Sequence, residues 1–376
     1  MPELSQHVIA PAQVVRGHGA WAEALPFIPQ LGQRPLLLGR SASTAVVRAG
    51  LQVSLEAQGL TVLDAQLEHD CCWTDLHRLS AELLRGGVDA VIAVGGGKVL
   101  DAGKWLADHH GLPCVTVPTS AATCAGWTAL SNIYSPQGAF EGDVALARCP
   151  DLLIFDHGLV RQAPPRTLAS GIADAMAKWY EASVSSGAST DGLIQQAVQM
   201  ARVLRDQLLL DAEAAMANAR AGSTEPVSDA WVRVAEACGL TAGVVGGIGG
   251  ARCRTVAAHA VHNGLTQLPA SHGKLHGEKV GFGILVQLRL EEVLGANQLA
   301  AQARRQLVPV FRSLGLPISL DQLGLGATSL AELQEVCAFA CRADSDLHHL
   351  PFAVSDADLL AALVSTTAGI PCDVPA

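Results

Sequence analysis

The chain has 376 residues, of which 49% are hydrophobic and only 16% are charged, and its formal net charge is −10. This length allows two domains with sizeable cores, and an acidic balance without a basic run argues against nucleic acid and anionic membranes as partners. No secretory signal and no apolar run near the roughly 18 residues of a membrane helix is visible. The ten cysteines form no CxxC motif, so we expect reduced thiols and a cytoplasmic protein.

In the first half of the chain, short apolar runs typical of buried strands alternate with helical stretches. The predicted strands are 35–39, 61–63, 88–94, 113–118 and 152–156. Continuous apolar strands separated by helices predict a parallel sheet that is covered on both faces.

Three glycines, Gly95, Gly96 and Gly97, follow the clearest of these strands, and a helical pattern begins at Lys98. Such a turn lets the backbone approach a pyrophosphate, and the helix N-terminus offers unpaired N–H groups and a positive dipole. The turn departs from the GxGxxG fingerprint, and glycines also serve simple tight turns. A phosphate site and a structural turn therefore both stay open on the tripeptide alone.

Strand signals end near the Pro164-Pro165 pair, and long Ala- and Leu-rich stretches such as 193–210 and 231–245 follow. This change predicts an α/β domain over 1–163 and an all-helical domain over 164–376, with the proline pair as the hinge. The glycine-rich segment 246–250 favours close helix packing or a flexible turn.

Metal-ligand side chains recur in the predicted helical half. His259 and His262 share one face of a helix, His276 follows, and Asp174 lies in an otherwise apolar helix where an unpaired carboxylate would be costly. Two histidines and a carboxylate suit a divalent metal ion. Alternatively, the histidines are satisfied core residues and Asp174 caps its helix near its start. His272 and His276 could also pair as ligands, so spacing does not choose among the four histidines.

Six segments, in order along the chain, resemble the motifs of glycerol dehydrogenases, which belong to the metal-dependent, or iron-containing, alcohol dehydrogenase superfamily. They are GGGKVLD at 95–101, PTSAAT at 118–123, ALSNIY at 129–134, GIADA at 171–175, HAVHNGLT at 259–266 and HGEKV at 276–280. The similarity runs from about residue 16 to near the C-terminus, and six ordered motifs are far more specific than any one of them.

The resemblance implies a dehydroquinate synthase-like architecture, with a Rossmann-like nucleotide-binding domain, a helical metal-binding domain and the active site between them. It implies Asp174, His259 and His276 as metal ligands. Lys178 stands where the wider superfamily has a fourth ligand, a histidine, so zinc is implied, with iron as the alternative. His262 would either pass the released proton to solvent or only orient His259.

The resemblance also implies a nicotinamide cofactor, NAD or NADP, and a homo-oligomer, a dimer or an octamer. The low charged fraction agrees with subunit contacts. The residues implied to bind the cofactor are Gly95, Gly96, Gly97, Lys98, Asp101, Thr119, Ser120, Thr123, Thr128 and Leu130.

The chain departs from the family at three places. Glycerol dehydrogenases carry an aspartate that touches the polyol where this chain has Cys124, and Trp127 replaces a small polar residue nearby. Both changes predict a less polar substrate pocket, so we expect glycerol to be a poor substrate. The strand 35–39 is followed by Arg40 instead of the acidic residue that binds the ribose of NAD, which would permit the 2′-phosphate of NADPH. Alternatively, Arg40 only faces solvent.

Three other functions fit parts of the pattern. A sugar-phosphate cyclase of the dehydroquinate synthase type or a glycerol-1-phosphate dehydrogenase would share the architecture. Both need several basic side chains for a substrate phosphate, and Lys274 and Lys279 near His276 are too few. A non-catalytic scaffold is the third, and the intact set of metal ligands argues against it.

Overall fold

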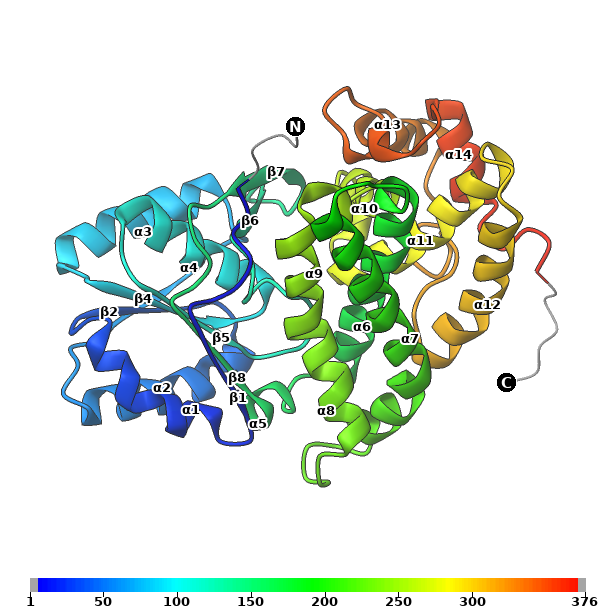
Figure 1. Ribbon diagram of the computed structural model, residues 1–376. Helices are drawn as coiled ribbons and strands as arrows, with labels where there is room; N and C mark the ends of the chain where they lie inside the picture. The colour runs from blue at the N-terminus through cyan, green and yellow to red at the C-terminus, as the bar shows by residue number, and fades with distance from the viewer. Residues whose placement is uncertain (1–5, 371–376) are drawn as a thin grey trace. The chain divides into compact units, whose positions relative to one another are not determined.

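The computed structural model describes residues 6–370. The chain divides into two compact units, which are drawn in Figure 1. The first runs to Pro164 and includes Gly239–Gly247, and the second comprises Pro165–Cys238 and the chain from Ile248 onward. The segment 239–247 thus packs with the first unit, although we predicted it within the second domain. Two glycines without side chains, Gly239 and Gly243, allow this segment to lie directly against the rings of Phe155 and Trp127. A Cβ added to either glycine would lie only 2.4 or 2.5 Å from the respective ring.

The first unit is built on a six-stranded sheet with the order β1-β8-β5-β4-β2-β3, and every pairing in it is parallel. The strands are β1 (Gln13–Gly17), β8 (Leu152–Asp156), β5 (Cys114–Pro118), β4 (Ala90–Gly95), β2 (Pro35–Gly39) and β3 (Leu63–Gln66). The predicted parallel sheet is confirmed. The strand expected at 61–63 starts two residues later. Strand β1 was not predicted, because it lies at the edge of the sheet and all of its side chains are partly or largely exposed.

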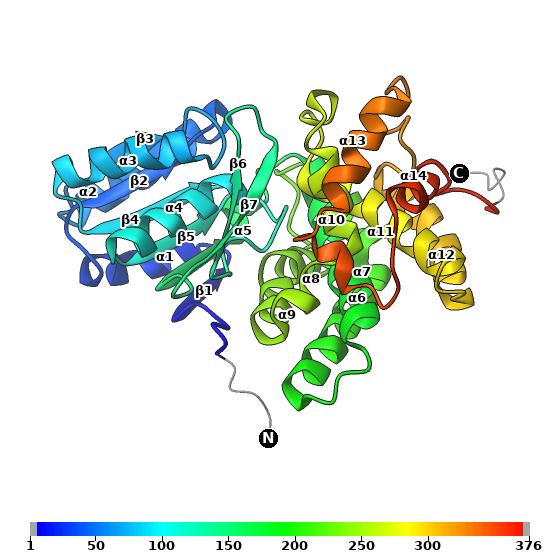
Figure 2. The ribbon, with the colours of Figure 1, turned by 90° about the horizontal axis from the view of Figure 1, so that it is seen from above.

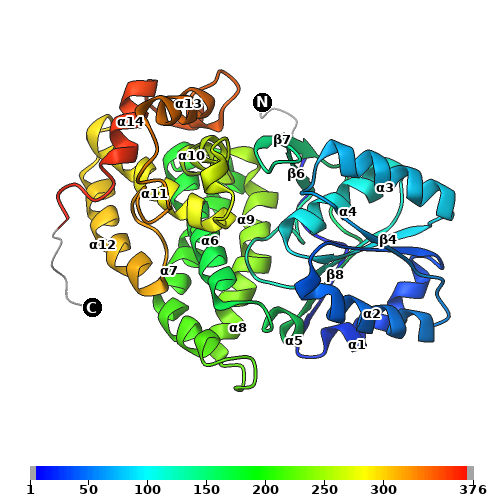
Figure 3. The same ribbon diagram turned by 180° about the vertical axis from the view of Figure 1, so that it is seen from behind.

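Helices cover both faces of this sheet, as Figure 3 shows. Helices α1 (Ala20–Ala24) and α2 (Ala45–Ala57) pack on one face against side chains such as Leu37, and α3 (Trp73–Gly86) and α4 (Gly97–His110) pack on the other against Leu36 and Leu38. Alternate residues of a strand point to opposite faces, so a strand buried on both sides must be apolar throughout. A small antiparallel hairpin, β6 (Leu130–Tyr134) and β7 (Phe140–Ala145), adds Ile133 to the α3/α4 side.

The second unit contains helices and connecting turns and, within residues 165–370, no strand. Its helices are α6 (Pro165–Ser186), α7 (Gly192–Arg220), α8 (Asp229–Glu236), α10 (Ala257–Leu265), α11 (His276–Val293), α12 (Gln298–Leu314), α13 (Leu330–Ala340) and α14 (Asp356–Val364). Helix α11, most of whose residues are buried, packs against α6, α10 and α12 (Figure 2).

One helical stretch, Asp229–Gly249, is long and apolar enough by composition to cross a membrane, and we did not expect a stretch of this kind. It joins α8, a short π-helical turn and α9 (Ala242–Gly249), and 61% of its most apolar window is buried against the rest of the chain. Such burial is typical of a core helix, so this stretch does not indicate a membrane protein.

Candidate active site and metal centre

Three helices of the second unit bring Asp174, His259 and His276 together. Oδ1 of Asp174 on α6 lies 3.4 Å from Nε2 of His259 on α10 and 3.2 Å from Nε2 of His276 on α11. Asp174 and His259 are buried, and the side chain of His276 is 24% exposed. Ligands about 2.0–2.2 Å from a tetrahedral metal ion would lie about 3.3–3.6 Å apart, so these spacings fit a divalent ion such as zinc. The three predicted ligands therefore form one cluster.

Glycines on α11 allow this approach of the helices. A Cβ added to Gly277 would lie 1.8 Å from the carbonyl oxygen of Ser170 on α6, and one added to Gly283 would lie 2.3 Å from that of Ala258 on α10. The backbone N–H of Gly277 also donates to Oγ of Ser170 at 2.9 Å. His276 is thus fixed directly at the contact between α11 and α6.

Replacing Gly277 with alanine is expected to push α11 away from α6 and displace His276. Overpacking of this kind costs about 1–3 kcal/mol, so both the free energy of unfolding and the affinity for a divalent metal ion should fall. Denaturant unfolding and analysis of the bound metal measure the two effects. The control is Gly273→Ala, because an added Cβ there meets nothing within 4 Å. Equal stability and metal content in the two variants would contradict this account of the packing.

Glu181, which the sequence did not single out, holds His259 in place. It is fully buried on α6, and its Oε2 lies 2.6 Å from Nδ1 of His259. Its Oε1 accepts from the backbone N–H groups of Val256 and His259 at 2.7 and 3.0 Å. Because a carboxylate accepts, Nδ1 carries the proton and Nε2 is left to face Asp174. A carboxylate behind a metal-binding histidine is a recurring feature of metal sites. The sequence signal was the spacing of Asp174 and Glu181, two helical turns apart on one face.

His262 contacts a different ligand from the one expected. Its Nε2 lies 3.0 Å from Nδ1 of His276, and its Nδ1 lies 2.9 Å from Oδ1 of Asn263. The ligand that His262 can orient is therefore His276 on α11, and not His259. The ring of His272 instead bonds the carbonyl of Thr266 at 2.9 Å, outside the cluster. The helix-cap interpretation of Asp174 is wrong, because Asp174 lies within α6, two turns from its start.

The charges of the cluster depend on burial and on near neighbours. Burial alone would raise the pKa of Asp174, but Lys178 and the hydrogen bonds from His259 and His276 hold it well below its ordinary value. Burial would lower the pKa of His259, but the Glu181 carboxylate and the bond to Asp174 raise it to about 9. Burial lowers the pKa of His276, and that of His262 falls well below its ordinary value. Metal ligands must be deprotonated, so binding of an ion here would release protons.

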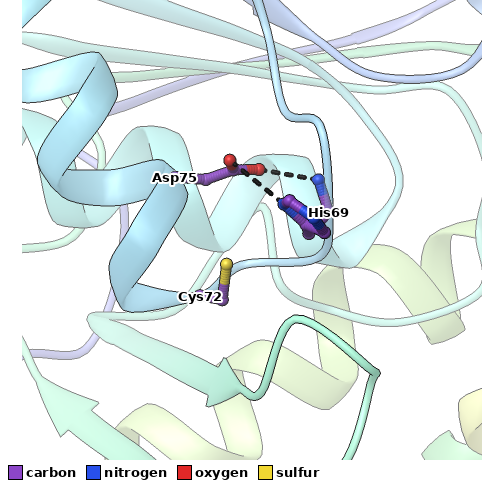
Figure 4. Close-up of side chains that lie close together, drawn as sticks. All are labelled: His69, Cys72 and Asp75. Carbon is purple, nitrogen blue, oxygen red and sulfur yellow. Dashed lines mark hydrogen bonds and ion pairs between the residues drawn. The ribbon is translucent and has the colours of Figure 1, made fainter.

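A second group of ligand-type side chains, His69, Cys72 and Asp75, lies in the first unit (Figure 4). Oδ2 of Asp75 accepts from the backbone N–H groups of Glu68 and His69, both at 2.8 Å. These bonds satisfy the buried carboxylate and hold the loop before α3. They account for Asp75 without an ion.

The glycine turn at the start of α4 has the geometry of a phosphate site. Gly96 precedes the helix without a side-chain cap, and a Cβ added to it would meet nothing within 4 Å, so a ligand can approach this backbone closely. Added Cβ atoms on Gly95 and Gly97 would instead lie 2.8 Å from Val99 and 3.1 Å from Oγ1 of Thr123. The uncapped N-terminus with its positive dipole therefore fits the pyrophosphate of a dinucleotide.

Two of the other predicted cofactor residues, Thr119 and Thr123, lie against this turn. The N–H of Thr119 donates to the carbonyl of Gly95 at 3.0 Å. Oγ1 of Thr123 accepts from the N–H of Ala125 at 3.2 Å. The side chain of Ser120, which follows Thr119 in the sequence, is half-buried.

A buried lysine that the sequence did not single out, Lys104, connects three of the remaining predicted residues. Its Nζ lies 2.9 Å from Oδ1 of Asp101 and 3.1 Å from the carbonyl of Thr128, and it also donates to the carbonyl of Leu130. Asp101 is thus paired with Lys104 and buried. The signal was an Asp-x-x-Lys spacing on an apolar helix.

The two predicted pocket residues and Arg40 also lie in the first unit. Cys124 and Trp127 are half-buried, and Nε1 of Trp127 donates to the carbonyl of Ile9 at 2.9 Å, so its indole is fixed in orientation. The side chain of Arg40 is 40% exposed, but it also forms an ion pair with Asp70 and therefore does not simply face solvent.

Comparisons with known proteins indicate the family of this chain. The family model described as iron-containing alcohol dehydrogenase matches residues 11–157. An uncharacterized oxidoreductase of Synechocystis sp. is 52% identical over 96% of this chain and 92% of its own length. A glycerol dehydrogenase of Escherichia coli is 33% identical, covering 96% of each chain.

A solved structure supports the same assignment. The crystal structure of a probable glycerol dehydrogenase from Sinorhizobium meliloti superposes with a TM-score of 0.85 at 29% identity, over 97% of this chain and 99% of that one. The family binds NAD(P) and a divalent metal ion, and the residues described above fit both groups. The chain therefore belongs to the iron-containing alcohol dehydrogenase family, as a glycerol dehydrogenase-like oxidoreductase.

Proposed function

We propose that this dehydrogenase transfers hydride between a nicotinamide cofactor and a small alcohol, diol or the corresponding carbonyl, with zinc held by Asp174, His259 and His276. The observation that carries the proposal is the convergence of two imidazole Nε2 atoms on one buried carboxylate oxygen, at 3.4 and 3.2 Å. Nitrogen and carboxylate ligands suit zinc and also iron. Nζ of Lys178, at the position of a fourth ligand in the wider superfamily, bonds the carbonyl of Arg254 at 3.4 Å instead.

A bound divalent ion would acidify a substrate hydroxyl, and the nicotinamide would take up or release the hydride. The contribution of the protein is to hold the ligands and the cofactor residues in orientation. Glu181 fixes the tautomer of His259, and Lys104 ties Asp101 to the Thr128–Leu130 segment. Burial lowers the pKa of His262 well below its ordinary value, and its Nε2 lies 3.0 Å from Nδ1 of His276. This contact supports a role for His262 in orienting that ligand or in relaying the released proton.

The proposed pocket is too apolar for glycerol, because Cys124 and Trp127 replace polar side chains. Replacing Cys124 with aspartate is expected to raise kcat/KM for glycerol by roughly 10- to 100-fold, since a hydrogen bond to a charged group contributes about 1.5–3 kcal/mol. Steady-state kinetics on glycerol and 1,2-propanediol measure the change, and Cys124→Ser is the uncharged control. A wild-type enzyme that already uses glycerol as well as less polar diols would contradict this.

The phosphate-dependent alternatives lack support around the cluster. Of the two nearby lysines, Lys274 bonds the carbonyl of Gln322 through Nζ at 3.0 Å, and Lys279 is buried. No set of free basic side chains is thus assembled for a substrate phosphate among the residues described near His276.

A panel of small alcohols, diols and carbonyls tests the proposal, assayed with NAD(H) and NADP(H) on zinc-loaded and iron-loaded protein. We expect turnover of small diols or hydroxycarbonyls that requires a metal and is higher with zinc. Light scattering on the same preparations tests the expected homo-oligomer. A protein that binds the cofactor and the metal but reduces or oxidises no member of the panel would refute the proposed reaction.

A further inference from the structure

Two basic side chains meet one carboxylate at the carboxyl edge of the sheet. Arg40 follows β2, Lys98 lies in the first turn of α4 after β4, and Asp70 lies in the loop after β3. These three strands are neighbours and parallel, so their carboxyl ends share one edge. Nη1 of Arg40 forms an ion pair with Oδ1 of Asp70, and Nζ of Lys98 forms one with Oδ2.

The carboxylate is much more buried than the two basic side chains. The side chain of Asp70 is 8% exposed, whereas those of Arg40 and Lys98 are 40% and 41% exposed. The aromatic ring of Tyr134, with its centroid 4.8 Å from Nζ of Lys98, holds that cation from another side. The anion therefore lies beneath two cations that remain accessible to a ligand from solvent.

The position of this triad specifies the ligand. Lys98 follows the glycine turn that fits the pyrophosphate, and Arg40 follows the strand whose end meets the adenosine ribose in dinucleotide-binding folds. A phosphate on the ribose 2′-hydroxyl would carry close to two negative charges and suit an arginine and a lysine. An unmodified ribose diol gains little from them.

We propose that Asp70 determines cofactor choice, because it occupies the two cations that a 2′-phosphate would otherwise bind. Two cations and one carboxylate leave a single net positive charge, so the site admits a 2′-phosphate without requiring it. The enzyme accordingly uses both NAD and NADP, and removal of the Asp70 charge shifts it towards NADP. This inference rests on the nucleotide site in the proposed function.

Calorimetric binding of adenosine 2′,5′-bisphosphate and adenosine 5′-monophosphate to the zinc-loaded full chain tests it without turnover. Asp70→Asn should strengthen binding of the bisphosphate about tenfold relative to the monophosphate, because a like charge close to the phosphate is removed. Arg40→Met should weaken the bisphosphate about tenfold and leave the monophosphate unchanged.

Two control variants separate charge from structure. Asp70→Glu keeps the carboxylate and should preserve the wild-type ratio of the two affinities even if Asp70→Asn folds poorly. Glu68→Gln removes an exposed negative charge in the same loop, one that pairs with Arg78, and should leave the ratio within about twofold because solvent screens it.

The outcomes distinguish the two proposals. An unchanged affinity ratio in Asp70→Asn and Arg40→Met, with monophosphate still bound, overturns the role of Asp70 and leaves the nucleotide site standing. Failure of the wild-type protein to bind either nucleotide overturns both. An equal shift of the affinity ratio in Glu68→Gln overturns the specific role of Asp70, since the overall negative charge of the loop would then explain the effect.

Discussion

The variant His276→Ala should lose alcohol-dependent reduction of the cofactor by about a thousandfold or more. His276 supplies one of three side chains around the proposed ion, and its Nε2 lies 3.2 Å from Oδ1 of Asp174. Stabilisation of developing charge by a bound cation is worth several kcal/mol, and each 1.4 kcal/mol corresponds to about tenfold in rate. Steady-state kinetics and zinc analysis of the purified variant measure the loss, which should appear in both.

A neighbouring histidine provides the matched control. His272 lies four residues earlier and its ring bonds the carbonyl of Thr266 outside the cluster, so His272→Ala should keep its zinc and most of its activity. Binding of the nucleotide should survive in both variants, because the proposed cofactor residues belong to the other unit. Near wild-type zinc content in His276→Ala would contradict the assignment of the ligands.

Glu181→Gln should weaken zinc binding by about 10- to 100-fold. The variant removes the charge behind Nδ1 of His259, which lowers the basicity of the ring and loosens its orientation. The amide oxygen can still accept from the N–H groups of Val256 and His259, so the start of α10 should persist. Competition with a chromophoric chelator measures the affinity, and excess zinc should restore much of the activity.

A second buried glutamate separates this effect from the general loss of a buried charge. Glu291 on α11 bonds Gln287 and Asn297 and contacts none of the three proposed ligands through its described hydrogen bonds. Glu291→Gln should therefore leave zinc affinity within about threefold of wild type, since supporting effects on a metal act through its own ligands. Equal weakening in the two variants would show that Glu181 has no specific role.

The α/β and helical halves could be predicted because their apolar runs are strong and uninterrupted. The strand 152–156 was placed at its observed bounds, since all five of its residues are buried. The edge strand β1 was not predicted, because none of its five residues is fully buried and Gln13 and Arg16 are exposed, so it has no continuous apolar run. The segment 239–247 was assigned to the wrong unit, since its packing on Phe155 and Trp127 is a tertiary contact that helical periodicity does not encode.

Some residues of the site could likewise be predicted from the sequence, whereas others depend on tertiary contacts. Asp174 could be singled out because a carboxylate in an apolar helix needs a partner, and the ordered motifs selected His259 and His276. The partner of His262 could not be predicted, because it depends on how closely glycines let α11 approach its neighbours. The pairing of Arg40 and Lys98 with Asp70 likewise arises from three separate strand ends that meet at one edge of the sheet.

Titration of zinc into chelator-stripped protein, with alcohol-dependent reduction of the nicotinamide as the readout, tests the central claim most directly. If Asp174, His259 and His276 form one catalytic metal site, activity should be absent at the start, rise with added zinc and level off at about one ion per chain. Full activity in the stripped protein, or zinc binding at one equivalent without any gain in activity, would contradict the account.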